Sequence, residues 1–176
     1  VIHNLITSKA VPEIIRENGG EPVRTRVGHS FIKAKMAETN AVFGGEHSAH
    51  YYFRDFWRAD SGMLAAMHVL AALGQQDKPL SEMMAKYNRY AASGEINSRL
   101  DSAEAQADRT EAVVKAFADR AENVDRLDGV TVELKDGNWF NVRASNTEPL
   151  LRLNVEADTQ EAVDALVKEI LAIIRA

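Results

Sequence analysis

The chain of 176 residues contains, at positions 139–156, the stretch WFNVRASNTEPLLRLNVE, and this stretch decides the fold of its second half. Residues 139–143 and 150–156 are rich in the apolar and β-branched side chains that are typical of strands. Pro149 lacks a backbone N–H and disfavours a helical conformation at Glu148, so the segment between the strands cannot wind into a helix. The stretch therefore predicts two strands joined by a short polar turn.

The turn is rich in hydrogen-bond donors, which come from its backbone N–H groups and from the side chains of Arg143, Ser145, Asn146 and Thr147. An arginine binds two oxygens of a phosphate in fork geometry, and a turn can direct its N–H groups at the other oxygens. We interpret residues 143–147 as a candidate phosphate-binding loop. The alternative is a polar hairpin end with an exposed arginine, which the spacing alone describes equally well.

The same sheet should contain further strands. Residues 95–100 and 130–134 have strand composition, and Asp136-Gly137 is a hairpin signal before the strand at 139–143. A long helix, capped by Asp101 or Ser102, is expected to extend to about residue 120, and Asp158 or Thr159 should cap a last helix. The second half is therefore predicted as an α+β domain whose mainly antiparallel sheet is covered by two helices.

Residues 1–90 alternate between strand and helix signals: strands are expected at 1–6, 22–27 and 41–43, and helices at 10–17 and 31–38, the second capped by Ser30. This alternation predicts a parallel sheet with helices on its faces, that is, a partial three-layer α/β domain. Ligands of such sheets bind beyond the carboxyl ends of the strands, where His29 and residues 46–50 fall.

Two more helices are expected at 61–74 and 79–90. Their apolar residues recur at helical spacing, and the methionines among them are expected to fill the core. Residues 51–58 are dense in aromatic side chains and favour a strand that packs against helices, with an aromatic platform for a sugar as the alternative.

Residues 91–94, which are small and polar, are the best candidate for a domain boundary, so we expect one domain at 1–92 and another at 93–176. The chain opens directly on a strand signal, and we therefore expect its N-terminus to be truncated.

Composition excludes several classes of protein. No stretch reaches the roughly 18–20 apolar residues that span a bilayer, and no signal peptide opens the chain. The net charge is −5 and there is no run of Lys or Arg, which disfavours nucleic-acid binding. The absence of cysteine removes disulfides and thiolate catalysis and is compatible with the cytoplasmic location that we expect.

A second polar loop, GGEHSAH at residues 44–50, follows the apolar residues 41–43. The combination of a G-E-x-S-G/A-H loop with a later R-x-S-N-T-E-P loop resembles the C-terminal half of the α-D-phosphohexomutases, and looks most like the bacterial phosphomannomutase/phosphoglucomutases. The resemblance extends over nearly the whole chain. It implies that residues 1–92 are the third domain of such an enzyme and residues 93–176 are its fourth.

The resemblance implies that Glu46 and Ser48 hold sugar hydroxyls. These residues are two apart on an extended loop, so both side chains can point the same way. The alternative is a glutamate that caps its own loop. The candidate phosphate-binding loop would hold the phosphate that is not being transferred.

Two histidines are further candidates. His50 is read as a phosphate contact or a proton carrier, because an unperturbed imidazole titrates near pH ~6.5. His29 matches a G-H-S turn that contacts substrate in similar enzymes, although a histidine before a helix is more often a structural cap. Ala49 replaces the glycine that is usual in this loop, which raises the question of its backbone angles.

We expect no metal site in this chain, because Glu46, His47 and His50 do not have a standard ligand spacing. Enzymes of the family transfer a phosphoryl group from a phosphoserine in a T-x-S-H-N-P-like loop, with Mg²⁺ held by a D-G-D-x-D-R loop, and neither string occurs here. The resemblance implies Mg²⁺ and a bisphosphosugar activator for the complete enzyme only. The expected partners are a hexose phosphate and the missing N-terminal domains, and the chain alone is expected to be inactive.

Three other interpretations stay open. A phosphoglucosamine mutase usually has Gln where this chain has His47, which modestly favours the hexose enzymes. A stand-alone phosphosugar-binding module would use the same two loops without chemistry. A purely structural α/β protein would leave both polar loops without a role.

Overall fold

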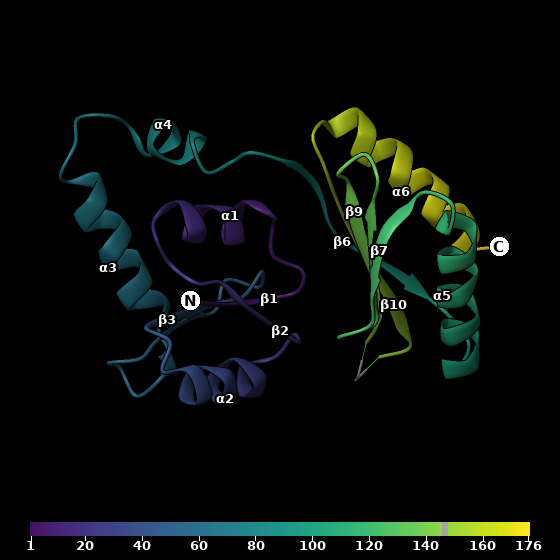
Figure 1. Cartoon of the computed structure of the whole chain (residues 1–176), viewed down its shortest axis with the longest axis horizontal. Helices are drawn as coiled ribbons and strands as arrows, with labels where there is room; N and C mark the ends of the chain where they lie inside the picture. Colours follow the sequence, from purple (N-terminus) through teal and green to yellow (C-terminus); the bar gives the residue numbers. More distant parts are fainter. Residues whose placement is uncertain (146–147) are drawn as a thin grey trace. The chain divides into compact units, whose positions relative to one another are not determined.

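A computed structural model describes residues 1–145 and 148–176 (Figure 1). The chain divides into two units, Val1–Arg89 and Tyr90–Ala176, and each unit has its own five-stranded sheet. None of the helices in the described part of the chain combines the length and the apolar character that crossing a bilayer requires.

The sheet of the first unit has the order β2-β1-β3-β4-β5 and consists of the strands β1 Ile2–Asn4, β2 Val23–Thr25, β3 Phe43–Gly45, β4 Tyr51–Phe53 and β5 Ala59–Asp60. β1 runs parallel to both β2 and β3, as the alternation of strands and helices predicts. β4 and β5 are antiparallel additions, so the sheet is mixed and not wholly parallel. Only short loops connect β3 to β4 and β4 to β5. These loops permit antiparallel pairing, because a parallel neighbour would need a long crossover connection.

The helices α1 (Ala10–Glu17) and α2 (His29–Thr39) lie on opposite sides of this sheet (Figure 1). Ile32 and Met36 of α2 are fully buried against Ile2 and Tyr52. The expected capping role of Ser30 is wrong, because α2 already begins at His29 and its N-cap is Gly28, whose φ of 128° favours glycine.

Two strand predictions in this unit need correction. The third strand covers Phe43–Gly45 and not residues 41–43, because Gly44 and Gly45 form its ladder with β1 and β4. The aromatic segment 51–58 is a strand only in its first three residues and then turns back toward β5. Trp57, at the tip of this turn, is 81% exposed and does not pack against a helix.

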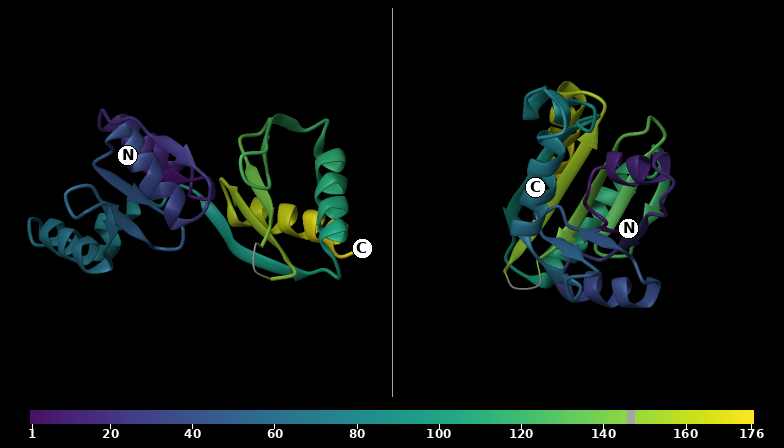
Figure 2. Two further views of the ribbon diagram at one scale, coloured as in Figure 1. Left: turned by 90° about the horizontal axis from the view of Figure 1, so that it is seen from below. Right: turned by 90° about the vertical axis from the view of Figure 1, so that its left-hand side faces the viewer.

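The helices α3 (Gly62–Leu73) and α4 (Leu80–Ala85) differ most from expectation. In Figures 1 and 2 α4 lies away from the sheet, whereas α3 contacts it through His68, whose ring stacks on that of Phe53 of β4 with centroids 5.5 Å apart. Neither helix has a buried residue. The side chains expected to fill a core are exposed, including Met63 at 76% and Met67 at 60%. Helical periodicity identifies side chains that favour burial, but it does not supply the surface that buries them.

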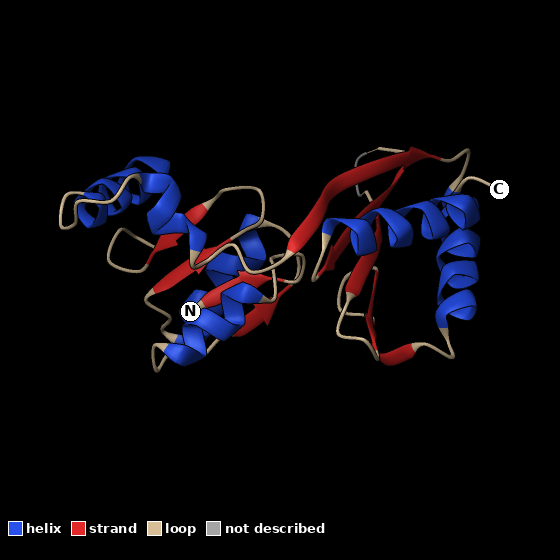
Figure 3. Cartoon of the chain, turned by 90° about the horizontal axis from the view of Figure 1, so that it is seen from above, coloured by secondary structure: helices blue, strands red, loops and turns tan. Residues whose placement is uncertain are grey.

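The sheet of the second unit has the order β6-β10-β9-β8-β7, is wholly antiparallel, and consists of the strands β6 Ala91–Arg99, β7 Ala121–Asp125, β8 Val130–Leu134, β9 Trp139–Ala144 and β10 Leu150–Ala157. Residues 91–94, where the domain boundary is expected, begin the long edge strand β6, in which Ala91 and Ala92 pair with Ala157 and Glu156 (Figure 3). The edge strand β7 was not expected: the helix before it was predicted to end at about residue 120, and residues 121–125 were assigned to no element.

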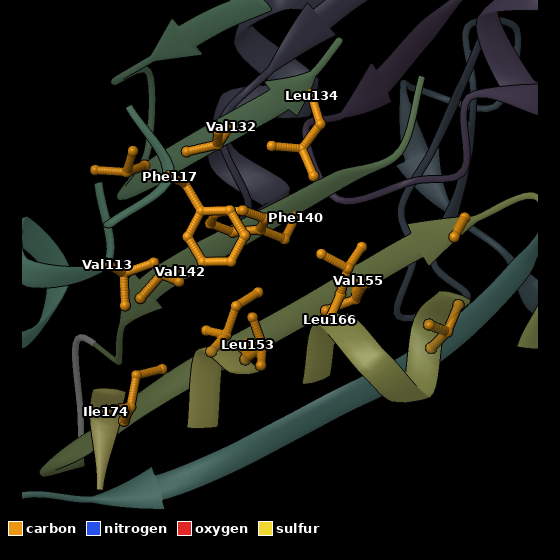
Figure 4. Packing of buried hydrophobic residues seen from close by; sticks show 14 of the residues in the cluster. Val113, Phe117, Val132, Leu134, Phe140, Val142, Leu153, Val155, Leu166 and Ile174 are labelled. Atoms are coloured by element: carbon orange, nitrogen blue, oxygen red, sulfur yellow. The ribbon is translucent and has the colours of Figure 1, made fainter. Parts of the chain in front are cut away.

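Two helices, α5 (Ala103–Phe117) and α6 (Gln160–Ile174), cover one face of this sheet (Figures 1 and 3). Ser102 caps α5 by accepting a hydrogen bond from the N–H of Ala105, and Thr159 caps α6 in the same way, so the open choice of capping residue is decided at both ends. In the core, Phe117 and Phe140 meet edge to face with ring centroids 4.9 Å apart (Figure 4).

The opposite face of the second sheet is polar. Along β9 and β10 the side chains alternate, so that Phe140, Val142, Leu153 and Val155 enter the core. The intervening positions carry polar or charged groups, among them Asn141, Arg143, Arg152, Asn154 and Glu156. The candidate phosphate-binding arginine therefore lies on the face that the helices leave uncovered.

Candidate functional site

The first unit contains a cavity of about 540 Å³ beyond the carboxyl ends of β2 and β3. The residues that line it include Gly28, His29, Lys33, Glu46, Ser48 and His50. This is the edge at which the sequence placed a ligand, and four of the candidate residues meet there. His47 points elsewhere, because it lines a smaller cavity of about 280 Å³ with residues of the N-terminal segment.

The Glu46 carboxylate is buried, with 6% of the residue exposed, and it is held by three donors. The Tyr52 hydroxyl donates to Oε1 at 2.7 Å, and the N–H of Gly28 donates to Oε2 at 3.0 Å. The Asn4 side-chain amide donates to Oε2 at a longer 3.4 Å. Glu46 thus joins β1, the loop before α2 and β4, while its side chain still lines the cavity.

This network also fixes the protonation of Tyr52. Burial raises the pKa of the Tyr52 hydroxyl, and the hydrogen bond to the negatively charged Glu46 raises it further. The phenol therefore stays protonated and remains a donor at any physiological pH. With three donors in place, a carboxylate retains limited capacity to accept one more hydrogen bond.

Ser48 and His29 are exposed at the cavity. Lys33, one turn after His29 on α2, adds a positive charge to the same wall. These groups give the cavity donors and positive charge, which suit an anionic, hydroxyl-rich ligand.

His50 is paired with Asp60, which is not among the site residues that the sequence predicts. Nδ1 of His50 lies 2.6 Å from one carboxylate oxygen of Asp60, and the other oxygen accepts the N–H of Tyr51 at 2.9 Å. The hydrogen bond to Asp60 raises the pKa of His50 above its ordinary value. Burial acts to raise the pKa of Asp60, but the hydrogen bonds from His50 and Tyr51 outweigh it and the pKa is lowered. No spacing rule would have found this pair, because it depends on the antiparallel pairing of β4 with β5.

The structure also gives the backbone conformation of Ala49, which stands where glycine is usual in the loop at residues 44–50. Ala49 has a φ of 63°, in the left-handed region where glycine is favoured. The alanine therefore keeps the turn that a glycine would adopt, at a cost of roughly 1–2 kcal/mol.

Among the described residues, no group of three or more His, Cys, Asp or Glu side chains is arranged to hold a metal ion. These residues do not fit a magnesium site, and we assign no step of any reaction to the ion.

In the second unit, Arg143 is an internal residue of β9 and is only 6% exposed. The strand was expected to end at Arg143, and it continues to Ala144. The Arg143 guanidinium makes no hydrogen bond to any described residue, Nε is buried without a partner, and the nearest carboxylate oxygen, of Glu95, is 3.8 Å from Nη2. A buried charge with so few partners is costly unless a ligand completes its hydrogen bonds.

Ser145 follows directly after β9, and its N–H donates to the carbonyl of Leu150 at 2.8 Å. Asn146 and Thr147, the other two candidates of this loop, lie outside the described residues. Arg152, which sequence reasoning missed, donates to the Ser145 hydroxyl at 3.3 Å. The alternation of β10 places it on the same polar face as Arg143, and this was the available signal.

The two units match two domains of the same protein family. The family description of the phosphoglucomutase/phosphomannomutase alpha/beta/alpha domain III matches residues 1–90, and that of the C-terminal domain matches residues 95–173.

Curated relatives agree with these matches. The phosphomannomutase of Methanocaldococcus jannaschii is 41% identical over 174 residues, which cover 99% of this chain and 37% of that protein. A phosphomannomutase of Escherichia coli is 38% identical over 178 residues, covering 99% and 38% respectively. The chain thus spans well under half the length of the curated relatives that it matches.

Solved structures share the fold. A phosphoglucomutase/phosphomannomutase family protein from Burkholderia thailandensis superposes with a TM-score of 0.79 at 27% identity, over 99% of this chain and 37% of that one. The pp63/parafusin of Paramecium, at 17% identity and a TM-score of 0.73, shows the same fold. With both domain matches, the relatives and the fold in agreement, the chain belongs to the phosphoglucomutase/phosphomannomutase family and corresponds to the C-terminal portion of its members.

Proposed function

We propose that this chain is the substrate-binding portion of a phosphohexomutase that interconverts the 6-phosphate and the 1-phosphate of mannose, glucose or both. The first unit supplies contacts to the sugar, and the second unit supplies contacts to the phosphate that is not being transferred. The reaction proceeds through a phosphoserine and a bisphosphosugar, which require groups that this chain does not contain. A cytoplasmic location is part of the same proposal.

The observation that carries the proposal is the Arg143 guanidinium. It is buried, makes no hydrogen bond to a described residue, and is followed two residues later by the hydroxyl of Ser145. A fork of N–H donors that makes no hydrogen bond to a described residue matches the oxygens of a phosphate monoester. The chain has a net charge of −5, so a phosphate has to be attracted by local charge of this kind.

For the sugar, the supporting feature is the cavity that Glu46 and Ser48 line. Because Glu46 is fixed by three donors, its remaining acceptor capacity is rigidly placed for one sugar hydroxyl. The Ser48 hydroxyl is exposed and can both donate to and accept from a second one.

In the reaction, the residues of this chain bind and orient the substrate, and a histidine carries a proton. Phosphoryl transfer depends mainly on positioning and on charge stabilisation, so a fixed sugar and a fixed distal phosphate contribute directly to the rate. His50, whose pKa is raised by its hydrogen bond to Asp60, is placed to donate a proton at Nε2 or to contact a phosphate oxygen. His29 is a second contact at the same wall.

The proposal is tested by titrating the ¹⁵N-labelled chain with a hexose 6-phosphate and following the amide signals by NMR. Shifts should centre on Arg143, Ser145 and their neighbours, and Arg143→Ala should abolish them. Arg143→Lys keeps the charge and much of the stem but offers a point charge in place of a fork, so it should bind at least about tenfold more weakly than wild type.

Arg126→Ala is the matched control, because Arg126 belongs to the same unit but is exposed and paired with Glu111. Each variant is first checked for a dispersed spectrum, since Arg143 is buried. Full-strength binding by folded Arg143→Lys, or shifts that lie elsewhere in the chain, would refute the phosphate-site assignment.

A further inference from the structure

The two faces of the first sheet are covered unequally. Ile2, Gly44 and Tyr52 are neighbours in the ladders of β1, β3 and β4 and face α2, and Ile2 is 0% and Tyr52 1% exposed. The alternating residues of the same strands point to the opposite face. This second face is formed by His3, Phe43, Gly45, Tyr51 and Phe53, of which only His3 is buried.

An apolar groove crosses this second face from α1 to α3. One part, of about 280 Å³, is lined by Val11 of α1, and the other, of about 880 Å³, is lined by Val69 of α3. Phe43 and Tyr51 line both parts, so the two are continuous. The rings of Tyr51, Phe43 and Phe53 follow one another with centroids 6.3 Å and 5.2 Å apart. We call this feature the aromatic groove.

The helix α3, which forms one wall of the aromatic groove, is apolar on all sides. It contains no charged side chain, and none of its residues is buried. Met63, Met67 and Leu70 are 76%, 60% and 64% exposed. A helix that is apolar all round is normally buried, and a contiguous exposed apolar patch marks an interaction surface. The groove and its wall therefore require a partner.

The partner also has to satisfy one polar group, on His3. Nδ1 of His3 lies 3.1 Å from the carbonyl oxygen of Asn4 and 2.9 Å from Oγ1 of Thr7. Because a carbonyl oxygen can only accept, Nδ1 carries the ring proton. Burial lowers the pKa of His3, so the ring is neutral and its Nε2 is an acceptor. Nε2 makes no hydrogen bond to any described residue, and His3 lines the groove. A partner that covers this acceptor has to offer it a donor.

The position of the groove favours a helix as the partner. β1, β3 and β4 are interior strands of the order β2-β1-β3-β4-β5, so the groove lies over a face of the sheet and offers no free strand edge. A segment that lies there has to pair its own backbone groups, which a helix does. A second copy of this chain fits less well, because its exposed apolar helix, α3, is itself a wall of the groove.

The curated relatives are long enough to supply such a helix. The matched region is only 37% of the Methanocaldococcus jannaschii protein and 38% of the Escherichia coli protein. We propose that the aromatic groove receives an amphipathic helix from the part of the complete polypeptide that lies outside this chain. The helix presents an apolar stripe to the aromatic row and to α3, and one hydrogen-bond donor to Nε2 of His3. The two parts then share one core, and this chain is not an independent module. The inference does not require a phosphate at Arg143.

The test uses a single introduced thiol, because the chain contains no cysteine. Ala66 of α3 is exposed and lines the groove, so Ala66→Cys places a small reporter there. The variant is made in this chain and in the complete polypeptide. Its reaction with a maleimide is followed by mass spectrometry of the peptide that contains the new cysteine. The rate should fall at least about tenfold in the complete polypeptide, as for a site that reacts only when a local contact opens.

Ala37→Cys is the matched control, because Ala37 is an exposed alanine of α2, which lies on the other side of the sheet (Figure 1). It should react at the same rate in both proteins. Equal rates of Ala66→Cys in the two proteins would overturn the proposal. Protection of Ala66→Cys that depends only on the concentration of the chain would overturn it too, because the partner would then be a second copy.

The donor to His3 is tested with His3→Phe, which keeps an aromatic ring and removes the acceptor. In the complete polypeptide with Ala66→Cys, this change leaves the donor of the helix unpaired and should speed the reaction by roughly fivefold or more. In the isolated chain, where the groove is open, it should leave the rate unchanged. Circular dichroism first establishes that each variant is folded. An unchanged rate in the complete polypeptide would mean that nothing donates to His3 and would overturn that part of the proposal.

Discussion

The imidazole of His50 acquires its properties from one neighbour. The side chain is 53% exposed, and in isolation it would titrate near its ordinary value of 6.5. The Asp60 carboxylate, 2.6 Å away, favours the charged imidazole and is itself fixed by the N–H of Tyr51. A single contact thus keeps a proton at the cavity over a wider pH range.

The pKa of His50, followed through its ring protons by NMR, should lie above 6.5 in wild type and fall in Asp60→Asn. Because the folded state binds this proton more tightly than the unfolded state, the contribution of the pair to stability is present below pH 6.5 and is lost as the pH rises through the folded pKa. The contribution is small, since both side chains are partly exposed.

Asp55→Asn is the matched control, because Asp55 is exposed, pairs with Arg54 and has no contact with His50. An equal His50 pKa in wild type and Asp60→Asn would mean that the contact does not persist in solution.

Among the elements, β3 differs from its predicted bounds: the strand was expected at residues 41–43 and covers Phe43–Gly45. Gly44 sits over α2, and a Cβ built on it would lie 2.9 Å from Cγ2 of Ile32 and 3.2 Å from Sδ of Met36. The strand therefore continues through two glycines, because only a residue without a side chain lets α2 pack this closely on the sheet. Gly44 and Gly45, which the sequence motif places in the loop, are therefore part of the strand β3.

Gly44→Ala should accordingly destabilise the chain by about 1–3 kcal/mol, the usual cost of overpacking a buried site. Gly45→Ala is the control, because its Cβ would meet only ordinary contacts at 3.6 Å and 3.8 Å, and its effect should stay within about 0.5 kcal/mol. Both values come from urea unfolding monitored by circular dichroism. Equal stability of the two variants would contradict the close packing of α2.

Elements with strong local sequence signals have the bounds that the sequence predicts. The helix α1 has the predicted bounds, Ala10–Glu17, and β8 has the predicted bounds, Val130–Leu134. The edge strand β7 has no comparable signal, since only its pairing with β8 makes it a strand.

At the scale of the whole molecule, each unit has its own core. In the first unit Ile2, Ile32 and Met36 are fully buried, and in the second unit Phe117 and Phe140 are. The two family matches fall on the same division, at residues 1–90 and 95–173. Each unit presents one candidate binding feature, and neither includes a cluster of acidic side chains for a metal among the residues described.

We therefore expect the chain by itself to have no mutase activity, because the serine donor and the metal-binding loop that the family resemblance implies do not occur in its sequence. The assay uses purified chain with a hexose 1-phosphate, a bisphosphosugar activator and Mg²⁺, and detects the 6-phosphate through a coupled dehydrogenase. Buffer without protein gives the background. Turnover above background that follows the chain through purification would refute this expectation.

The sequence by itself determined the family resemblance, the two polar loops and the class of each unit. It could do so because motif spacing, capping residues and hydrophobic periodicity are local properties that a chain carries before it folds. Glu46 and Arg143 are candidate site residues because of the two loop motifs in which they occur.

Only the tertiary structure decided which groups these residues meet. Glu46 is bound by Tyr52, Gly28 and Asn4, which are distant from one another in the sequence, and Arg143 shares Glu95 with Arg152 through the order β6-β10-β9. The exposed methionines of α3 show the same limit, since periodicity records a preference for burial and only the packing of other elements can satisfy it. Partners across a sheet are fixed by register and strand order, and these are properties of the folded chain.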